Sequence, residues 1–178
     1  EQDNRSLAKF AKCLLFEPAD SQEAFDMVTA GFELSEKYQV PVIVRTTTRT
    51  AHTSTLVDIG SGERGEAPGI PYVKNAQRNV AVPAHGRLMR FAVEKRSAAL
   101  RELTETTPFN RAEPGTGDLG IVASGVAYQY VKEIFPEAPV FKVGLSCPPP
   151  IEKIRAFAAG VKRLVVVEES DPVLAEQI

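Results

Sequence analysis

Short apolar runs alternate with helix-length segments along two stretches of this chain. In the first, the run CLLF at 13–16 precedes a helical pattern, and the run VPVIV at 40–44 follows it. In the second, LGIVASG, APVFKVG and VKRLVVVEES are apolar runs separated by two further helix-length segments. Strands that alternate with helices of this length form parallel sheets with helices on their faces. The sequence therefore predicts an α/β fold.

Local signals mark where the helices begin and end. Asp20 is placed to cap a helix that runs to Tyr38, with Glu23 in the capping-box position. Prolines precede the segment IEKIRAFAAG, and Gly160 marks its end. Asp171 and Pro172 predict the start of a last helix in DPVLAEQI.

The middle of the chain has a different composition and a weaker periodicity. Glycines and prolines are frequent between residues 58 and 83, and the periodicity there is weak, which indicates a connection. A helix is expected at 85–106. The layout is therefore two parallel-sheet α/β pieces, at 1–58 and 116–178, joined by a long connector at 59–115 that carries one helix.

Composition excludes several classes of function. The net charge of −2 gives no bulk electrostatic reason to expect a nucleic acid or a membrane as partner. No apolar run is long enough to span a bilayer, and Cys13 and Cys147 form no metal-binding pair. A cytoplasmic protein is expected. Because the first residue is Glu1 and the final helix would stop after two turns, a fragment of a longer polypeptide is expected as well.

Four strand exits are candidate sites, because ligands of open parallel sheets lie outside the carboxyl ends of the strands. They are residues 45–52, 123–125, 143–150 and 168–172. The first is the most polar, with Arg45, Thr48, Arg49 and His52 in the run RTTTRTAH. These side chains would suit an anion. They would equally suit ion pairs across a domain or subunit interface, and the interface is the favoured interpretation.

Each of the other exits also has two interpretations. The turn at 123–125 suits an anion or tight packing of a helix on a strand. Glu168 and Glu169 suit acid–base chemistry, or capping of the next helix with the side chains facing solvent, which is favoured. Cys147 is a reactive thiol or a packed small apolar residue. No catalytic triad, phosphate-binding loop or metal cluster is recognisable, so no catalytic residue is assigned.

Several stretches together resemble the large subunit of the indolepyruvate ferredoxin oxidoreductases, in the 2-oxoacid:ferredoxin oxidoreductase superfamily. The most specific are VRTTTRTAHT and GIVASGVAYQYVKE; the others are EQDNR, AKFAK, EPADSQEAFDMV, PFNR and VKRLVVVEESDPVLAEQ. Their order and spacing match over most of the chain. The glycine- and proline-rich connector is the least specific part.

The resemblance implies an identity for each piece. Residues 1–58 would be the C-terminal part of a domain that binds the aminopyrimidine ring of thiamine diphosphate, and residues 116–178 a truncated domain similar to the transketolase C-terminal domain. Such enzymes oxidatively decarboxylate aryl 2-oxoacids to acyl-coenzyme A. Electrons pass through iron–sulfur clusters to ferredoxin, and thiamine diphosphate with Mg²⁺ supplies the carbanion chemistry. A second, smaller subunit is the expected partner.

The resemblance also implies what this chain lacks. The acidic residue that activates the aminopyrimidine should lie before Glu1, and the diphosphate–magnesium motif and the cysteine-rich module should lie after Ile178. The chain alone is therefore expected to be inactive and to hold no cofactor. Arg49 and His52 match an arginine–Thr/Ala–His pattern of the superfamily, so Arg45, Thr48, Arg49 and His52 are expected to line an interdomain seam or site wall.

Two other functions remain open. The chain would be a small-anion- or nucleotide-binding regulatory α/β module if the turn at 123–125 and the arginines bind a ligand. It would otherwise belong to a different 2-oxoacid:ferredoxin oxidoreductase that acts on pyruvate, 2-oxoglutarate or a branched-chain 2-oxoacid.

Overall fold

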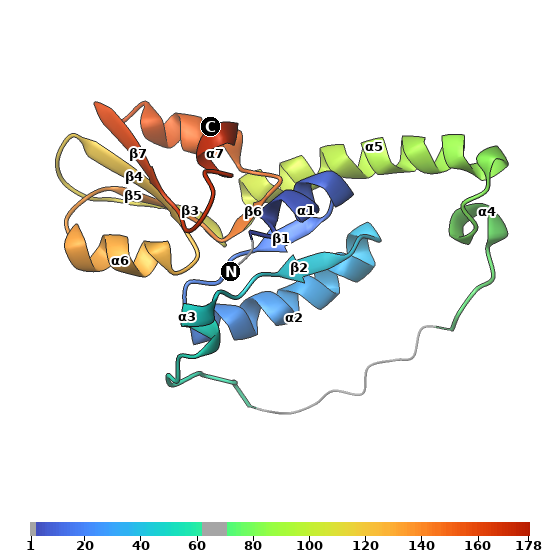
Figure 1. Ribbon diagram of the computed structural model, residues 1–178, viewed down its shortest axis with the longest axis horizontal. Helices are drawn as coiled ribbons and strands as arrows, with labels where there is room; N and C mark the ends of the chain where they lie inside the picture. Colours follow the sequence, from blue (N-terminus) through green and yellow to red (C-terminus); the bar gives the residue numbers. More distant parts are fainter. Residues whose placement is uncertain (1–2, 62–70) are drawn as a thin grey trace.

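The computed structural model describes residues 3–61 and 71–178 (Figure 1). Its helices are α1 (Arg5–Ala11), α2 (Ser21–Tyr38), α3 (Thr48–Ala51), α4 (Ala76–Asn79), α5 (Pro83–Thr106), α6 (Ala127–Ile134) and α7 (Ile151–Ala158), followed by the 3₁₀ helix η1 (Ala175–Gln177). Its strands are β1 (Leu14–Phe16), β2 (Val42–Val44), β3 (Asn110–Glu113), β4 (Leu119–Ser124), β5 (Val140–Val143), β6 (Leu145–Cys147) and β7 (Arg163–Val167). The predicted α/β fold with two sheets is confirmed.

Each sheet has a parallel centre and one antiparallel edge. In the first sheet the order is β2-β1-β6, with β1 parallel to β2 and antiparallel to β6. In the second the order is β3-β5-β4-β7, with β4 parallel to both β5 and β7, and β3 antiparallel to β5. The antiparallel edges are a departure from the all-parallel pieces that the sequence predicted.

The chain changes sheets at Gly144. Strands β5 and β6 belong to different sheets, yet this single residue separates them. A Cβ atom on Gly144 would lie 2.7 Å from the Phe109 carbonyl oxygen and 2.9 Å from Met27 Cε, so no side chain fits where the chain changes sheets.

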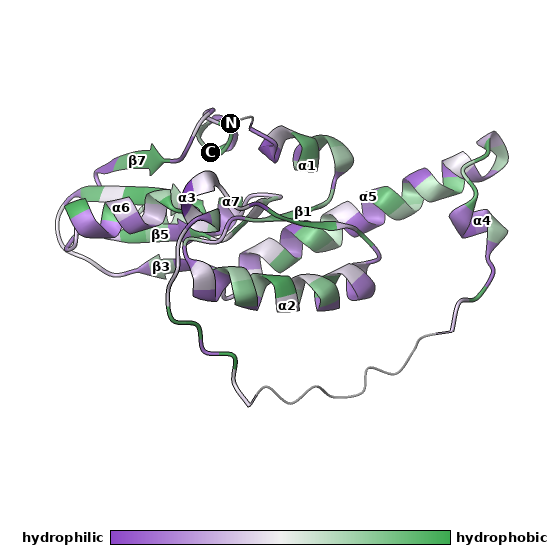
Figure 2. Cartoon of the chain, turned by 60° about the horizontal axis from the view of Figure 1, so that its bottom comes forward, coloured by the Kyte–Doolittle hydropathy of each residue, from purple (hydrophilic) through white to green (hydrophobic). Residues whose placement is uncertain are grey.

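The two sheets have separate apolar cores. Buried residues of the first come from α1, β1, α2, α5 and β6, including Ala8, Leu14, Phe16, Met27, Leu100 and Leu145. In the second sheet, β4 and β5 pack against α7 on one face and α6 on the other. Figure 2 shows the central strands as mainly apolar and α5 as banded with polar residues. Most of the first half of α5 is exposed, and this helix extends away from both sheets (Figure 1).

The helix signals are mostly confirmed. α2 begins after Asp20, whose carboxylate accepts the Glu23 N–H at 2.9 Å. The Glu23 carboxylate accepts the N–H of Ala19 rather than that of Asp20, so the reciprocal bond is shifted by one residue. The helix expected from Asp171 is wrong: only η1 forms.

Backbone contacts account for the missing last helix. The Asp171 backbone donates to Asp3 and accepts from Arg5, so it is held by the N-terminal segment.

In the connector, α4 and β3 form in addition to the expected helix, and residues 62–70 lie outside the described part of the chain. The division at 1–58, 59–115 and 116–178 stays a prediction.

Candidate functional site

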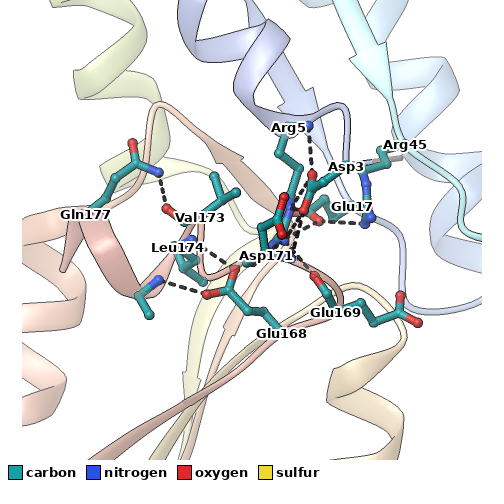
Figure 3. Close-up of polar contacts among 11 residues, drawn as sticks. Asp3, Arg5, Glu17, Arg45, Glu168, Glu169, Asp171, Val173, Leu174 and Gln177 are labelled. Carbon is teal, nitrogen blue, oxygen red and sulfur yellow. Dashed lines mark hydrogen bonds and ion pairs between the residues drawn. The ribbon is translucent and has the colours of Figure 1, made fainter. Parts of the chain in front are cut away.

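Residues from three of the four predicted strand exits meet in one buried group of side chains, which we call the strand-end junction. Its members are Asp3, Arg5, Glu17, Arg45, Ser146 and Glu168. Figure 3 shows the charged members, which come from the N-terminal segment, from the residues that directly follow β1 and β2, and from the end of β7. The junction therefore joins the two sheets.

Glu17 lies at the centre of this junction. It follows β1 directly and is 2% exposed. Its N–H donates to the Gly144 carbonyl at 2.8 Å, and its Oε1 accepts from Arg45 Nη1 at 3.2 Å. A Cβ atom on Gly125, where φ is +54°, would lie 3.8 Å from the Cβ of Glu17. Through Arg5, Glu17 also reaches the end of β7.

Arg5 ties the N-terminus of the chain to the end of β7. Its guanidinium donates to both carboxylate oxygens of Asp3, and its Nη1 donates to Glu168 Oε2 at 2.6 Å. Its Nη2 also donates to the carbonyls of Glu169 and Asp171, each at 2.6 Å. Burial raises the pKa of Asp3, but the hydrogen bonds and charge of Arg5 outweigh burial and bring that pKa down to about 2.

The carboxyl of Glu17 is in a different electrostatic position. Burial raises its pKa, and the opposing effects of the Ser146 hydroxyl, Arg5 and Arg45 do not cancel that rise. Although Ser146 lies near enough to influence this pKa, Glu17 Oε2 and Ser146 Oγ each lack a hydrogen-bond partner among the described residues. Glu17 is thus the least satisfied carboxyl of the junction.

The structure separates the four residues predicted on the first exit. Arg45 is buried and contacts Glu17, so its charge is not available to a ligand. Thr48 and Arg49 begin the short helix α3, and His52 is its C-terminal cap. All three are exposed. The Arg49 side chain is 66% exposed, 4.0 Å from Glu169 Oε1 and 5.4 Å from the centre of the Tyr130 ring. It therefore reaches from the first sheet towards α6 and β7.

The other exits are resolved in part. Glu168 caps the turn before η1, because its carboxylate accepts the N–H groups of Leu174 and Ala175 at 2.9 Å, which confirms the capping interpretation. The expectation that it faces solvent is wrong, because its side chain is 7% exposed and is held by Arg5. The turn at 123–125 is buried, in agreement with tight packing. Burial raises the pKa of the Cys147 thiol to about 11, which opposes a reactive thiolate.

Sequence reasoning missed Glu17 and Arg5. Glu17 reads as the first polar residue after an apolar strand, in front of a helix cap. Arg5 lies in the seven-residue helix α1, which is too short to give a periodic signal. The end of β1 was not among the four candidate exits, and the polar residue directly after this strand was the signal for Glu17.

The described residues contain no group of three or more His, Cys, Asp or Glu side chains that would hold a metal ion. Within residues 3–61 and 71–178, no helix is sufficiently long and apolar to traverse a bilayer. The groups present at the junction supply hydrogen bonds and charge.

Comparison with known proteins gives the family. No family model matches the chain. The indolepyruvate oxidoreductase subunit IorA of Methanothermobacter thermautotrophicus is 39% identical over 184 residues, which cover 100% of this chain and 30% of that protein. IorA of Pyrococcus abyssi is 38% identical over 188 residues, covering 100% of this chain and 29% of that protein. The chain thus spans about three tenths of the length of these curated relatives.

The fold agrees with this relationship. A solved 2-oxoglutarate:ferredoxin oxidoreductase from Magnetococcus marinus, with 2-oxoglutarate, coenzyme A and succinyl-CoA bound, superposes with a TM-score of 0.64 at 20% identity. The match covers 99% of this chain and 39% of that one. Over its whole length the chain is related to a segment of the indolepyruvate oxidoreductase subunits IorA, so the resemblance predicted from the sequence is confirmed. The solved neighbour shows the fold of that segment.

Proposed function

We propose that the chain is a scaffold segment of a thiamine-diphosphate-dependent indolepyruvate:ferredoxin oxidoreductase. The parent enzyme would convert an aryl 2-oxoacid and coenzyme A into the aryl-acetyl thioester and CO₂, and two electrons would pass through iron–sulfur clusters to ferredoxin. The observation that carries this proposal is the identity of 39% to IorA over the whole chain.

An iron–sulfur cluster is held by four ligands, most often cysteines, and this chain has two cysteines. We assign the iron–sulfur clusters to other parts of the parent enzyme, together with thiamine diphosphate and its Mg²⁺ as the family resemblance implies, and we assign no chemical step to this chain.

The strand-end junction supports the scaffold role. It fixes the ends of β1 and β2 against the end of β7 through contacts of Glu17 with Arg45 and of Arg5 with Glu168. Residues 1–58 would then form part of the pyrimidine-binding domain and residues 116–178 part of the transketolase C-terminal-like domain. The fixed geometry between them would hold a wall of the cofactor pocket in place.

Arg49 is the residue we assign to the outer face of that wall. Its guanidinium is exposed, and its contacts with Glu169 and Tyr130 are long. Thr48 and His52 lie on the same short helix and would contribute to the same seam. The seam would face a neighbouring domain or the smaller subunit. Cytoplasmic localisation is part of this proposal.

The test uses the full-length polypeptide that contains this chain, co-expressed with the smaller subunit. We expect coenzyme A-dependent reduction of a viologen dye with indolepyruvate, and much slower reduction with pyruvate, 2-oxoglutarate or a branched-chain 2-oxoacid. A preference for one of the latter would assign the chain to another branch of the superfamily. Absence of activity with every 2-oxoacid would refute the oxidoreductase function.

A regulatory module that binds a small anion is the second candidate, and the exposed Arg49 is the observation in its favour. Calorimetry of the chain with coenzyme A, nucleotides and thiamine diphosphate separates the two candidates. Stoichiometric binding by the chain alone would favour the module, whereas no binding would favour the scaffold.

A further inference from the structure

The first half of helix α5 extends away from both sheets (Figure 1). Together with the short helix α4 that precedes it, this half forms a protruding segment, residues 71–96, which we call the arm. An isolated helix shorter than about 12–15 residues is only marginally stable in water, because most helices in proteins are stabilised by the packing of an apolar face. A helix that leaves the body of its own chain therefore needs another surface to pack on.

The helix of the arm has one partly covered face and one exposed face. Met89 and Val93 are half-buried on the side of α4. Phe91 lies two residues from each of them, on the other side of the helix, and is 62% exposed. Arg87 and Lys95 lie about one turn before and one turn after Phe91. The exposed face of the arm therefore has an apolar centre between two cations.

The arm is strongly basic. It contains one carboxylate, Glu94, and six cations, which are Lys74, Arg78, Arg87, Arg90, Lys95 and Arg96. Its net charge is therefore +5 in a chain whose net charge is −2, so the remainder of the chain carries −7. Within the part of the chain that the structure describes, Arg87 contacts the ring of Phe91 at 5.9 Å, and neither Arg87 nor Lys95 forms an ion pair. Charge complementarity selects an acidic surface as the partner of the arm.

Helix α2 has an exposed face with the opposite charge. Its apolar side chains Phe25, Val28 and Phe32 are 42%, 45% and 74% exposed. Glu33 and Glu36 are exposed on the same helix, and their carboxylates have no hydrogen bond or ion pair among residues 3–61 and 71–178. This α2 face combines apolar side chains with unpaired carboxylates, as the arm combines them with unpaired cations.

A groove beside the α2 face can receive an aromatic ring. Its volume is about 310 Å³, and its walls include Val28 and Phe32 of α2 and Val42 and Val44 of β2. Strand β2 is at the edge of its sheet, and no described strand pairs with its outer side. Exposed apolar surface of this kind, next to polar side chains, is typical of an interaction site.

We propose that the arm of one copy of this chain packs on the α2 face of a second copy. Phe91 enters the groove between α2 and β2, and Arg87 and Lys95 pair with Glu33 and Glu36 of the second copy. The second copy places its own arm on α2 of the first, so the contact occurs twice and closes a two-fold dimer. A second copy is the favoured partner because the groove and the unpaired carboxylates lie together on one helix of this chain.

Sedimentation equilibrium of the chain at increasing concentration tests the proposal. We expect a dimer whose dissociation constant rises with salt, because ion pairs contribute to it. Arg87→Glu combined with Lys95→Glu should raise the dissociation constant by about tenfold or more. Adding Glu33→Arg and Glu36→Arg to that same chain should restore the dimer, because both signs are then reversed. Arg155→Glu on the exposed surface of α7 is the matched control and should leave the dissociation constant unchanged.

Phe91→Ala tests the apolar centre of the contact separately. Phe91 belongs to none of the apolar cores, so the variant should still unfold cooperatively in urea. Its dimer should be weaker by about tenfold or more, because a buried aromatic anchor is lost. Phe135→Ala, at the end of α6, removes an aromatic ring from a residue that is 43% exposed and should leave the dimer unchanged.

Three results would overturn the proposal. The first is a chain that stays monomeric at its highest soluble concentration. The second is a dimer that neither the charge reversal nor Phe91→Ala weakens, because another surface would then hold it. The third comes from hydrogen exchange of the arm amides: protection only in the full-length polypeptide would assign the arm to another part of that polypeptide, and protection only on phosphatidylserine vesicles would assign it to a membrane surface.

Discussion

Arg5 Nη1 and Glu168 Oε2 form a buried ion pair of 2.6 Å, although 163 residues separate them in the chain. The first belongs to the N-terminal helix α1, and the second follows β7, the edge strand of the second sheet. Because Glu168 also caps the turn before η1, this one pair connects the start of the chain, the second sheet and the C-terminal turn. The fold of the C-terminal segment thus depends on a residue at the opposite end of the sequence.

Replacing Arg5 tests that dependence. Arg5→Leu leaves the buried carboxylates of Asp3 and Glu168 without their cation, and we expect a loss of about 3–5 kcal/mol of folding free energy in urea titrations. The matched control is Arg155→Leu, which breaks an ion pair of similar length, 2.7 Å, with Glu152 on the surface of α7. That change should cost no more than about 1 kcal/mol. Equal losses of folding free energy for the two substitutions would mean that burial of the Arg5 pair does not increase its contribution to stability.

Asn110 is the second position where a single side chain joins separate elements. Its carboxamide nitrogen donates to the carbonyls of Thr104 and Leu145, and its oxygen accepts the N–H groups of Gly144 and Leu145. The residue is 1% exposed, so Asn110→Ala leaves these groups buried and unpaired. We expect a loss of about 3 kcal/mol or more in thermal or urea denaturation.

Asn110→Asp separates hydrogen bonding from packing. An aspartate keeps the volume and the accepting oxygen but cannot donate to both carbonyls, so it should also be strongly destabilised at neutral pH. Protonation restores one donor, so its deficit should become smaller as the pH is lowered. A deficit that does not change with pH would contradict the assigned hydrogen-bond pattern.

Local signals in the sequence were sufficient for most of the fold. The strands with apolar runs and the cap of α2 by Asp20 follow from short-range chemistry, so they were predictable. Strand β3, with the sequence NRAE, has no apolar alternation and exists because β5 pairs with it. The chain changes sheets at Gly144, in a space limited by the tertiary neighbours Phe109 and Met27, which no local signal in the sequence indicates.

The candidate site was less predictable for a related reason. The run RTTTRTAH drew attention to Arg45 and Arg49, but the sequence could not say that the first is buried against Glu17 and the second exposed. The partners of Arg5 are set by tertiary contacts across almost the whole chain. Composition and periodicity describe what each segment does locally, and the strand-end junction is made of contacts between segments.

Cys147 gives a prediction about pH. Burial raises its pKa to about 11, so at pH 8 the thiolate fraction should be lower than that of an unperturbed cysteine by about two orders of magnitude. Alkylation of the native chain by iodoacetamide should therefore be slow at pH 8 and should accelerate about tenfold per pH unit up to pH 10. Mass spectrometry of peptides, with the urea-unfolded chain as reference, measures the rates. Native and unfolded rates that agree at pH 8 would contradict a half-buried, neutral thiol.

Replacing Arg45 should destabilise the chain, whereas replacing Arg49, four residues further on, should have little effect on its stability. Arg45→Ala removes a buried side chain and the partner of Glu17, so we expect a loss of about 2–4 kcal/mol in the chain alone. Arg49 is 66% exposed with one long ion pair, so Arg49→Ala should change the stability of the chain by no more than about 0.5 kcal/mol.

In the full-length polypeptide, Arg49→Ala should instead weaken assembly with the smaller subunit, measured by sedimentation at increasing dilution, because its exposed guanidinium would face the seam. Arg155→Ala on the surface of α7, a residue with a similarly exposed side chain, is the control and should leave assembly unchanged. A large loss of stability in the isolated chain carrying Arg49→Ala would place Arg49 in an internal network. Unchanged assembly would remove it from the seam.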